Sequence, residues 1–281
     1  MRTKLVAYFL SIALPCISIA QVDSTQLKTR DDKRNQVYNY NNKLDIALTS
    51  VAAAATIFNF TQIFTKDRTP EEDILALDRE DVNGFDRRVA GNYNEKAKTT
   101  SDFFFSASIP LPLIVYAFDD KMRKDYLRLT LLYLEAMSIT GVTYSTSQQL
   151  NNRLRPFTYN QDIPLLQRTS GGARNSFFSG HTALVATSTF FLASTWDDYH
   201  PDSDMKWVIY GGATLATVLT GHFRMRAGKH FPSDVIVGGL VGSLSGLLVP
   251  KLHKNKEFGQ KGLSVLPVSG EYHGLRLAYR F

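Results

Sequence analysis

Cysteine is almost absent from this sequence of 281 residues, because Cys16 is the only one. It lies within the first twenty residues, in a stretch typical of a leader that is removed. A mature chain without cysteine forms no disulfide bonds and has no thiol chemistry. The composition therefore excludes a disulfide-stapled fold and a cysteine-based active site.

Charge of one sign is not concentrated in any part of the chain, although the formal net charge is +6. The basic residues are scattered, and the sequence has neither a basic face with interleaved aromatic residues nor a recognisable nucleic-acid-binding module. We therefore expect no nucleic acid partner. A basic balance suits anionic substrates and anionic lipid surfaces equally well.

Residues 1–20 have the three parts of a secretory signal peptide. Met1-Arg2-Thr3-Lys4 is the basic start, Leu5 to Ile19 is the apolar stretch, and Ser18-Ile19-Ala20 is a small-residue cleavage site. Residues 21–44 are polar, and we expect them to form a poorly ordered arm. The folded part of the chain should then begin near residue 45.

Six apolar segments of helical length follow between residues 45 and 250. They are residues 46–65, 103–118, 129–144, 182–196, 207–223 and 235–250, and only the third contains a charged residue, Glu135. Segments without a polar stripe favour lipid over water as their surroundings. We therefore predict an all-α fold, a six-helix transmembrane bundle. Because the segments are short and the mean hydropathy is slightly negative, a soluble periplasmic helical bundle is the alternative.

The C-terminal part of the chain has two further patterns. The last apolar segment carries Gly238, Gly242 and Gly246 at four-residue spacing, which is typical of helices that pack closely in membranes. Residues 251–281 begin with a basic linker and continue with two apolar stretches on either side of Ser269-Gly270-Glu271. This second pattern predicts a short C-terminal β-hairpin tail.

Three polar clusters lie between the apolar segments. They are Arg153-Leu154-Arg155-Pro156, the residues from Ser176 to Thr182, and the residues from Arg224 to Asp234. Each offers groups that bind a phosphate oxyanion, namely guanidinium forks, imidazoles or the free N–H groups at a helix start. Together they predict a phosphate site. Two arginines at such a site would repel a cation, so we expect no metal ion there.

The order and spacing of the clusters resemble the type 2 phosphatidic acid phosphatase and vanadium haloperoxidase superfamily. Its pattern is Lys-x6-Arg-Pro, then Pro-Ser-Gly-His, then Ser-Arg-x5-His-x3-Asp. The matching residues are Arg155-Pro156, Ser179-Gly180-His181, Arg224, His230 and Asp234. The chain departs from the pattern at Gln148, Phe178 and Phe223. The resemblance covers roughly residues 45–250.

The resemblance implies roles for the two histidines and the aspartate. His230 would attack phosphorus and form a phosphohistidine. Asp234, four residues later, would accept the N–H of one ring nitrogen of His230 and so aim the other nitrogen outward. His181 would protonate the leaving alcohol oxygen and then activate the water that cleaves the intermediate.

The same resemblance implies a set of phosphate-binding residues. Arg155 and Arg224 would bind the phosphoryl oxygens, whose charge must be stabilised during the transfer. Ser179 is expected to be the N-cap of an apolar helix, where its hydroxyl and the N–H of Gly180 would add hydrogen bonds. The resemblance therefore implies that these groups lie at helix ends.

Gln148 occupies the position where the family pattern has a lysine. A glutamine amide donates only a neutral hydrogen bond, which is weaker than the charge-assisted bond of an ammonium group. We therefore expect either a slower enzyme or compensation by a nearby cation such as Arg153.

We predict a metal-independent phosphatase, without a cofactor, that hydrolyses lipid phosphomonoesters or polyprenyl diphosphates. Its expected location is a bacterial-type inner membrane with the site facing the periplasm, and its expected partners are the lipid phosphate substrate and membrane lipids. A cleaved signal peptide would instead start the first of six spans from the periplasm and put the site in the cytoplasm, so the sequence leaves the orientation open. One alternative is a vanadate-dependent haloperoxidase, since vanadate fits the same pocket. The other is a phosphate-binding membrane protein whose catalytic power has weakened.

Overall fold

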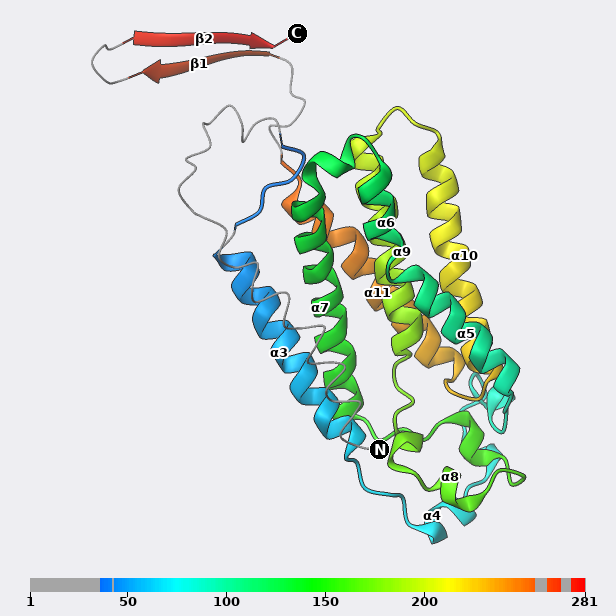
Figure 1. Cartoon of the computed structure of the whole chain (residues 1–281). Coiled ribbons are helices and arrows are strands. Elements are labelled where there is room, and N and C mark those ends of the chain that lie inside the picture. The colour runs from blue at the N-terminus through cyan, green and yellow to red at the C-terminus, as the bar shows by residue number, and fades with distance from the viewer. Residues whose placement is uncertain (1–35, 42, 256–261, 269–273, 281) are drawn as a thin grey trace. The chain divides into compact units, whose positions relative to one another are not determined.

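The computed structural model describes residues 36–41, 43–255, 262–268 and 274–280 (Figure 1). The chain divides into two units, one formed by Val37–Lys254 and the other by Met1–Gln36 together with Asn255–Phe281. The predicted signal peptide and most of the predicted polar arm lie outside the described residues.

The unit Val37–Lys254 is built from helices. Its longer helices are α3 (Leu44–Phe64), α5 (Glu95–Ser108), α6 (Leu111–Phe118), α7 (Tyr126–Leu150), α9 (Gly180–Tyr199), α10 (Met205–Arg226) and α11 (Pro232–His253). Shorter turns are α4 (Glu71–Leu75), α8 (Leu165–Arg168), η2 (Arg79–Asp81), η3 (Arg87–Val89), η4 (Met122–Asp125), η5 (Pro156–Tyr159) and η6 (Gly171–Arg174). The predicted helical class is therefore confirmed for the described part of this unit.

The second predicted apolar segment, residues 103–118, is split between α5 and α6. The Asn94 side chain starts α5 by accepting a hydrogen bond from the N–H of Ala97 at 2.8 Å. Pro110 and Pro112 lack an N–H group and cannot continue the hydrogen-bond pattern of α5, so α5 ends at Ser108 and α6 begins at Leu111.

Helix α9 lies at the centre of the unit and contacts α5, α6, α7, α10 and α11, whereas α3 packs on α7. Its contact with α11 is made by the glycine stripe. A Cβ atom would lie 2.5 Å from the carbonyl oxygen of Ser179 if added to Gly238, and 2.0 Å from that of Ala183 if added to Gly242. The two helix backbones therefore touch, as the four-residue glycine spacing predicted.

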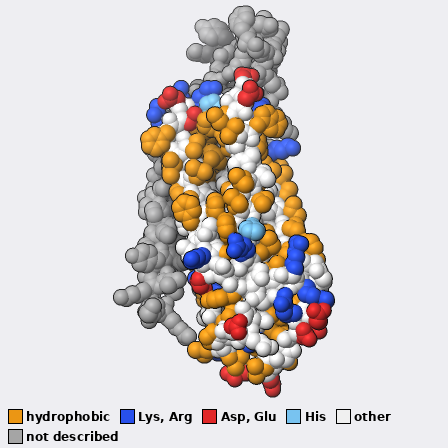
Figure 2. Space-filling view, turned by 90° about the vertical axis from the view of Figure 1, so that its right-hand side faces the viewer, with side chains coloured by type: hydrophobic (Ala, Val, Ile, Leu, Met, Phe, Trp, Pro, Cys, Tyr) orange, Lys and Arg blue, Asp and Glu red, His pale blue; other side chains and the backbone are white. Residues whose placement is uncertain are grey.

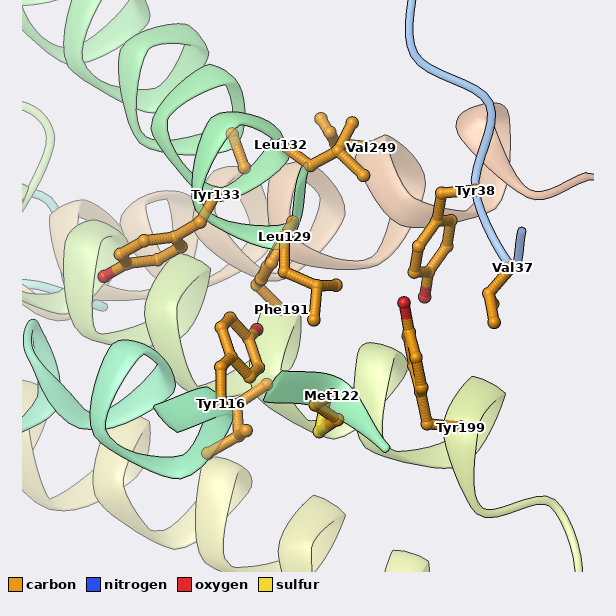
Figure 3. Close-up of a cluster of buried hydrophobic side chains, with 12 residues drawn as sticks. Val37, Tyr38, Tyr116, Met122, Leu129, Leu132, Tyr133, Phe191, Tyr199 and Val249 are labelled. Carbon is orange, nitrogen blue, oxygen red and sulfur yellow. The ribbon is translucent and has the colours of Figure 1, made fainter. Parts of the chain in front are cut away.

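A cluster of buried side chains fills the unit at the end away from the polar clusters (Figure 3). It contains Val37, Tyr38, Tyr116, Met122, Leu129, Leu132, Tyr133, Ala136, Phe191, Leu192, Tyr199 and Val249. The first two correct the expectation of a polar arm over residues 21–44. Tyr38 is fully buried because its ring packs in this core and its hydroxyl donates to Asp198 at 2.7 Å.

The outside of the helical unit exposes large apolar side chains. Helix α10 exposes Trp207, Val208, Leu215 and Val218, and α11 exposes Ile236, Leu240, Leu244, Leu248 and Leu252. On the face with α10 and α5, apolar side chains dominate the upper half, while charged ones gather at the upper rim and over the lower half (Figure 2). Such a large apolar exterior is typical of a surface that contacts lipid.

Three stretches of the described residues are long and apolar enough to cross a membrane. They are Leu44–Phe64, Glu95–Phe118 and Pro232–His253. The other long helices α7, α9 and α10 do not reach this level of hydropathy, because they carry more polar residues. The structure thus supports a membrane protein, with fewer strongly apolar spans than the sequence predicted.

The second unit contains two paired strands. Strand β1 (Gly262–Val268) runs antiparallel to β2 (Gly274–Arg280), with Gly262 opposite Arg280 and Val268 opposite Gly274. The basic linker was predicted to begin at residue 251, but α11 continues to His253. Residues 256–261 and 269–273, which hold the rest of that linker and the predicted hairpin turn, lie outside the described residues.

Candidate phosphate-binding site

The polar clusters meet at one end of the helical unit. Helices α7 and α10 end here, while α9 and α11 begin here (Figure 1). Arg155 follows α7, His181 lies in the first turn of α9, Arg224 in the last turn of α10, and His230 just before α11. Four chain segments thus contribute one functional side chain each.

His230 is buried, and its ring has a defined orientation. Its Nδ1 donates a hydrogen bond to the backbone carbonyl oxygen of Ser176 at 2.6 Å, which leaves Nε2 with a free lone pair. Burial, followed by the charges of Arg155 and Arg224, holds the pKa of His230 well below its usual value. The imidazole is therefore neutral at physiological pH, as a nucleophile must be.

Asp234 does not make the direct hydrogen bond to His230 that the spacing suggested, since its Oδ2 lies 4.0 Å from His230 Nδ1. Its carboxylate accepts hydrogen bonds from the hydroxyl of Ser176 at 2.6 Å and from the N–H of Phe231 at 2.8 Å. The reason is that Asp234 closes the first turn of α11 and bonds back to its start. Asp234 therefore reaches His230 through Ser176.

The guanidinium of Arg153 binds two carboxylates. Its guanidinium donates to Asp234 at 2.5 Å, to Asp86 at 2.6 Å and to the hydroxyl of Ser233 at 2.8 Å. Asp86 also accepts the N–H of Ser233 at 3.0 Å. Arg153 is thus a clamp on the start of α11, which argues against its expected role as a substitute for the family lysine.

Arg155 and Arg224 carry donors without partners. The Nε–H of each is buried and makes no hydrogen bond within the described part of the chain. Arg224 as a whole is buried, although its side chain makes long contacts to Ser101 at 3.4 Å and Asp102 at 3.3 Å. Buried Nε–H groups without acceptors favour binding of an anion, because an anion supplies the missing hydrogen bonds.

Asp102 on α5 was missed by sequence reasoning. Its Oδ1 lies 3.0 Å from His181 Nε2 and 3.3 Å from a terminal nitrogen of Arg224. The ring of Phe105, one turn further along α5, packs against the His181 ring with 4.5 Å between centroids. The sequence offered one signal for Asp102, which is that it directly precedes the apolar segment 103–118.

Ser179 and Gly180 are both fully enclosed. Ser179 is the N-cap of α9 by position, but its hydroxyl bonds to that of Thr182 at 2.8 Å and caps no backbone N–H. A Cβ at Gly180 would lie 2.7 Å from the ring of Tyr144. Gly180 is therefore required by packing, and the first-turn N–H groups of α9 remain free of intrahelical acceptors.

Gln148 is buried beneath the second cluster. Its amide nitrogen donates to the carbonyl oxygen of Phe178 at 2.9 Å, while its amide oxygen has no hydrogen-bond partner among the described residues. Lys66 donates to the backbone carbonyl oxygen of Gln148 at 2.6 Å. The glutamine thus supports the loop before α9.

Lys229 is a further cation beside the site. Gly228, with φ +68°, turns the chain after α10, and a Cβ there would lie 1.8 Å from the carbonyl oxygen of Asn92. This turn places the Lys229 ammonium 4.9 Å from the centroid of the Phe157 ring. Burial and the charges of Arg155 and Arg224 lower the pKa of Lys229 to about 8. Lys229 makes no ion pair within the described residues.

The chain matches one family and two solved structures. Residues 129–258 match the family model of the PAP2 superfamily, so this part of the chain is similar to PAP2-type domains. It contains each of the three clusters. No curated protein matched the chain.

The solved structures resemble the chain more distantly. The crystal structure of Aquifex aeolicus LpxE has 25% identity and a TM-score of 0.39, and covers 59% of this chain and 92% of that chain. That of the first transmembrane PAP2 type phosphatidylglycerolphosphate phosphatase from Bacillus subtilis has 20% identity and a TM-score of 0.37. It covers 74% of this chain and 92% of that chain.

Proposed function

We propose that this chain is a membrane phosphatase that hydrolyses lipid phosphates through a phosphohistidine intermediate. The observation that carries the proposal is the pair of buried, unpaired Nε–H groups of Arg155 and Arg224 near the neutral ring of His230. A phosphoryl group offers negative oxygens to both guanidinium groups and a phosphorus atom to the nucleophile. The PAP2 family match supports the same reaction class.

The proposed first step transfers the phosphoryl group to His230. Nε2 attacks phosphorus as the bond to the leaving alcohol oxygen breaks, and His181 gives its proton to that oxygen. In the second step His181 takes a proton from water, the hydroxide attacks phosphorus, and the P–N bond breaks to release phosphate and His230. Arg155 and Arg224 hold the phosphoryl oxygens throughout.

Lys229 is proposed to supply the charge that Gln148 does not. The charges of Arg155 and Arg224 act on its ammonium, and no carboxylate among the described residues lies within ion-pair distance of it. Arg153 is unsuited to this role because Asp86 and Asp234 already neutralise it. The site then binds phosphate with three cations.

The lipid nature of the substrate is proposed from the surface beside His181. Helix α5 presents Phe103, which is 68% exposed, and Phe105, which contacts the His181 ring. Phe104 stacks on Phe223 of α10, with 6.1 Å between ring centroids. An apolar chain attached to the phosphate would therefore find aromatic and aliphatic surface directly beside the leaving-group side of the site.

We propose that α3, the α5–α6 segment, α7, α9, α10 and α11 form six membrane spans, with the phosphate site facing the periplasm. Single cysteines at exposed positions Gln161 and Asp202, each in a Cys16→Ser background, would test this. A membrane-impermeant thiol reagent should label the cysteine at 161 from the periplasm and not that at 202. The opposite labelling would place the site in the cytoplasm.

The function is tested by phosphate release from short-chain phosphatidic acid, phosphatidylglycerol phosphate and a polyprenyl diphosphate in detergent micelles. The wild-type chain should turn over at least one of them, be inhibited by orthovanadate, and remain active in EDTA at low temperature. His230→Ala should lower kcat by at least about a thousandfold. Turnover by His230→Ala, or inactivity of the wild type on all lipid phosphates, would overturn the proposal.

Matched variants separate chemistry from folding. Arg155→Gln should lower kcat/KM by roughly a hundredfold or more. Arg168→Gln removes another buried arginine, whose guanidinium donates to the carbonyl oxygens of Thr158 and Ile74. It should lower the melting temperature and leave kcat/KM within a few fold of the wild-type value.

A further inference from the structure

A second group of ionisable side chains lies at the end of the helical unit opposite the phosphate site, where α3 begins and α11 ends (Figure 1). It consists of Asp45 from the first turn of α3, Glu135 from α7 and His253 from the last turn of α11. One ligand atom of each residue lies within 4.8 Å of those of the other two. Nothing in the proposed phosphatase chemistry uses this group.

The group has an excess of buried negative charge. Asp45 is 7% exposed and Glu135 is 8% exposed. Oε2 of Glu135 is buried and accepts no hydrogen bond, and no lysine or arginine in the described part of the chain forms an ion pair with either carboxylate. Two carboxylates so placed repel each other unless a cation joins them.

The histidine of the group is oriented as a metal ligand. Nδ1 of His253 donates to the backbone carbonyl oxygen of Val249 at 2.9 Å, which leaves Nε2 as the lone-pair nitrogen. Nε2 lies 3.4 Å from Oδ2 of Asp45 and 3.6 Å from Oε2 of Glu135. Two atoms bound tetrahedrally to zinc at about 2.0–2.2 Å are roughly 3.3–3.6 Å apart. The two distances from His253 agree with this spacing, and the two carboxylate oxygens lie within 4.8 Å of each other.

We propose that Asp45, Glu135 and His253 bind a divalent metal ion of the zinc class, with a structural role. The ion joins the start of α3 to α7 and to the end of α11. It lies away from the phosphate site, takes no part in phosphoryl transfer, and stabilises the bundle by binding only the folded chain.

The test uses the full chain in detergent, stripped with a chelator and then titrated with Zn²⁺ alone. Elemental analysis after dialysis should find about one zinc per chain, and Zn²⁺ should raise the melting temperature. Glu135→Gln and His253→Gln should each bind Zn²⁺ at least tenfold more weakly and lose the thermal shift. The matched control is His200→Gln, because His200 pairs with a single carboxylate, Asp119, at 3.0 Å.

Three outcomes would overturn the proposal. The wild type fails to bind Zn²⁺ stoichiometrically, which leaves a shared proton as the only cation in the cluster. Alternatively, Glu135→Gln and His253→Gln bind as the wild type does, which makes the zinc an adventitious ion only. If the variants fail to fold, the wild type loaded with Co²⁺ is measured instead. A low-coordinate site of nitrogen and oxygen ligands gives Co²⁺ visible absorption bands, and the absence of these bands would refute the site.

EDTA should lower the melting temperature without abolishing phosphatase activity at low temperature. This result separates the metal proposal from the proposed function.

Discussion

Asp234 and His230 are linked through Ser176, which contacts Asp234 with its hydroxyl and His230 with its backbone carbonyl oxygen. The Asp234 carboxylate accepts the hydroxyl of Ser176, and the carbonyl oxygen of the same serine accepts Nδ1–H of His230. The carboxylate thus fixes the position of the acceptor and does not receive the histidine proton itself. Its effect on the nucleophile depends on how rigidly Ser176 is held.

Ser176→Ala should lower kcat about tenfold and leave KM nearly unchanged. The substitution keeps the carbonyl acceptor of His230 but removes a charge-assisted hydrogen bond of about 1.5–3 kcal/mol that holds it in place. Asp234→Asn should have a larger effect, because it also weakens the contact to Arg153. Steady-state kinetics on one lipid phosphate measures both. The control Ser188→Ala removes a buried hydroxyl that bonds to Ser108, and it should affect stability only. Wild-type kcat for Ser176→Ala would show that the serine hydroxyl does not position His230.

Lys229 should make phosphate binding depend on pH. Its pKa in the folded chain is lowered to about 8 by burial and by Arg155 and Arg224, so the ammonium is present below this pH and lost above it. KM should therefore rise about tenfold from pH 7 to pH 9, because the deprotonated lysine no longer makes a charge-assisted hydrogen bond to phosphate. Lys229→Met should have the raised KM at pH 7 and a flatter profile. Lys206→Met, whose lysine pairs with Asp197 and lies at the other end of α10, serves as the control. A profile in Lys229→Met that matches the wild type would assign the pH dependence to another group.

Gln148→Lys tests whether a lysine at position 148 can replace the charge of Lys229. In the wild type we expect a change in kcat/KM of less than about threefold, because Lys229 already supplies the charge, and a lower melting temperature, because position 148 is fully buried. In a Lys229→Met background, Gln148→Lys should raise kcat/KM about tenfold and so restore the value lost with Lys229. Equal effects in both backgrounds would mean that Gln148 and Lys229 do not share the phosphate.

Asp102→Asn should lower kcat about tenfold. The amide can still contact the ring of His181, but it loses the charge that holds both His181 and Arg224 in place. Kinetics on the same lipid phosphate checks this, together with Asp120→Asn, a control at an exposed carboxylate that pairs with Arg123. A faster enzyme would instead show that Asp102 competes with phosphate for Arg224.

Gly242→Ala should destabilise the bundle by about 1–3 kcal/mol, because the added methyl group meets the backbone of α9. Gly239→Ala is the matched control on the same helix, since a Cβ there meets nothing closer than 3.6 Å. Alanine at position 239 should be neutral or stabilising, by up to about 1 kcal/mol of helix propensity. Thermal unfolding in detergent distinguishes the two. Equal stability of both variants would mean that α9 and α11 are not in backbone contact.

The sequence predicted the helical class, because the apolar segments between residues 45 and 250 are of helical length. The segment 103–118 is the exception to one helix per segment, since its prolines divide it between α5 and α6. The structure brings four residues assigned to phosphate chemistry, Arg155, His181, Arg224 and His230, to one end of the unit (Figure 1). Their chemical roles stay a prediction. The glycine stripe on α11 correctly indicated a backbone contact. These features depend on local patterns that packing does not reverse.

The contacts that sequence reasoning missed all depend on how distant helices pack. Asp102 reaches His181 only because α5 lies against α9 and α10. The hydrogen bond from His230 goes to a backbone carbonyl, and every residue has one, so no side-chain pattern marks Ser176. Asp45, Glu135 and His253 look like isolated polar residues until α3, α7 and α11 are assembled.

The glycine stripe has a consequence for substrate range. Helix α9 carries His181 in its first turn and α11 begins two residues after His230, so the distance between the two backbones sets the width of the active centre. Gly238 lies closest to this end, with Ser179 as its neighbour. A larger residue there should widen the gap between His181 and His230 without touching either. A substitution inside the bundle can therefore change the size of the group that fits between the two histidines.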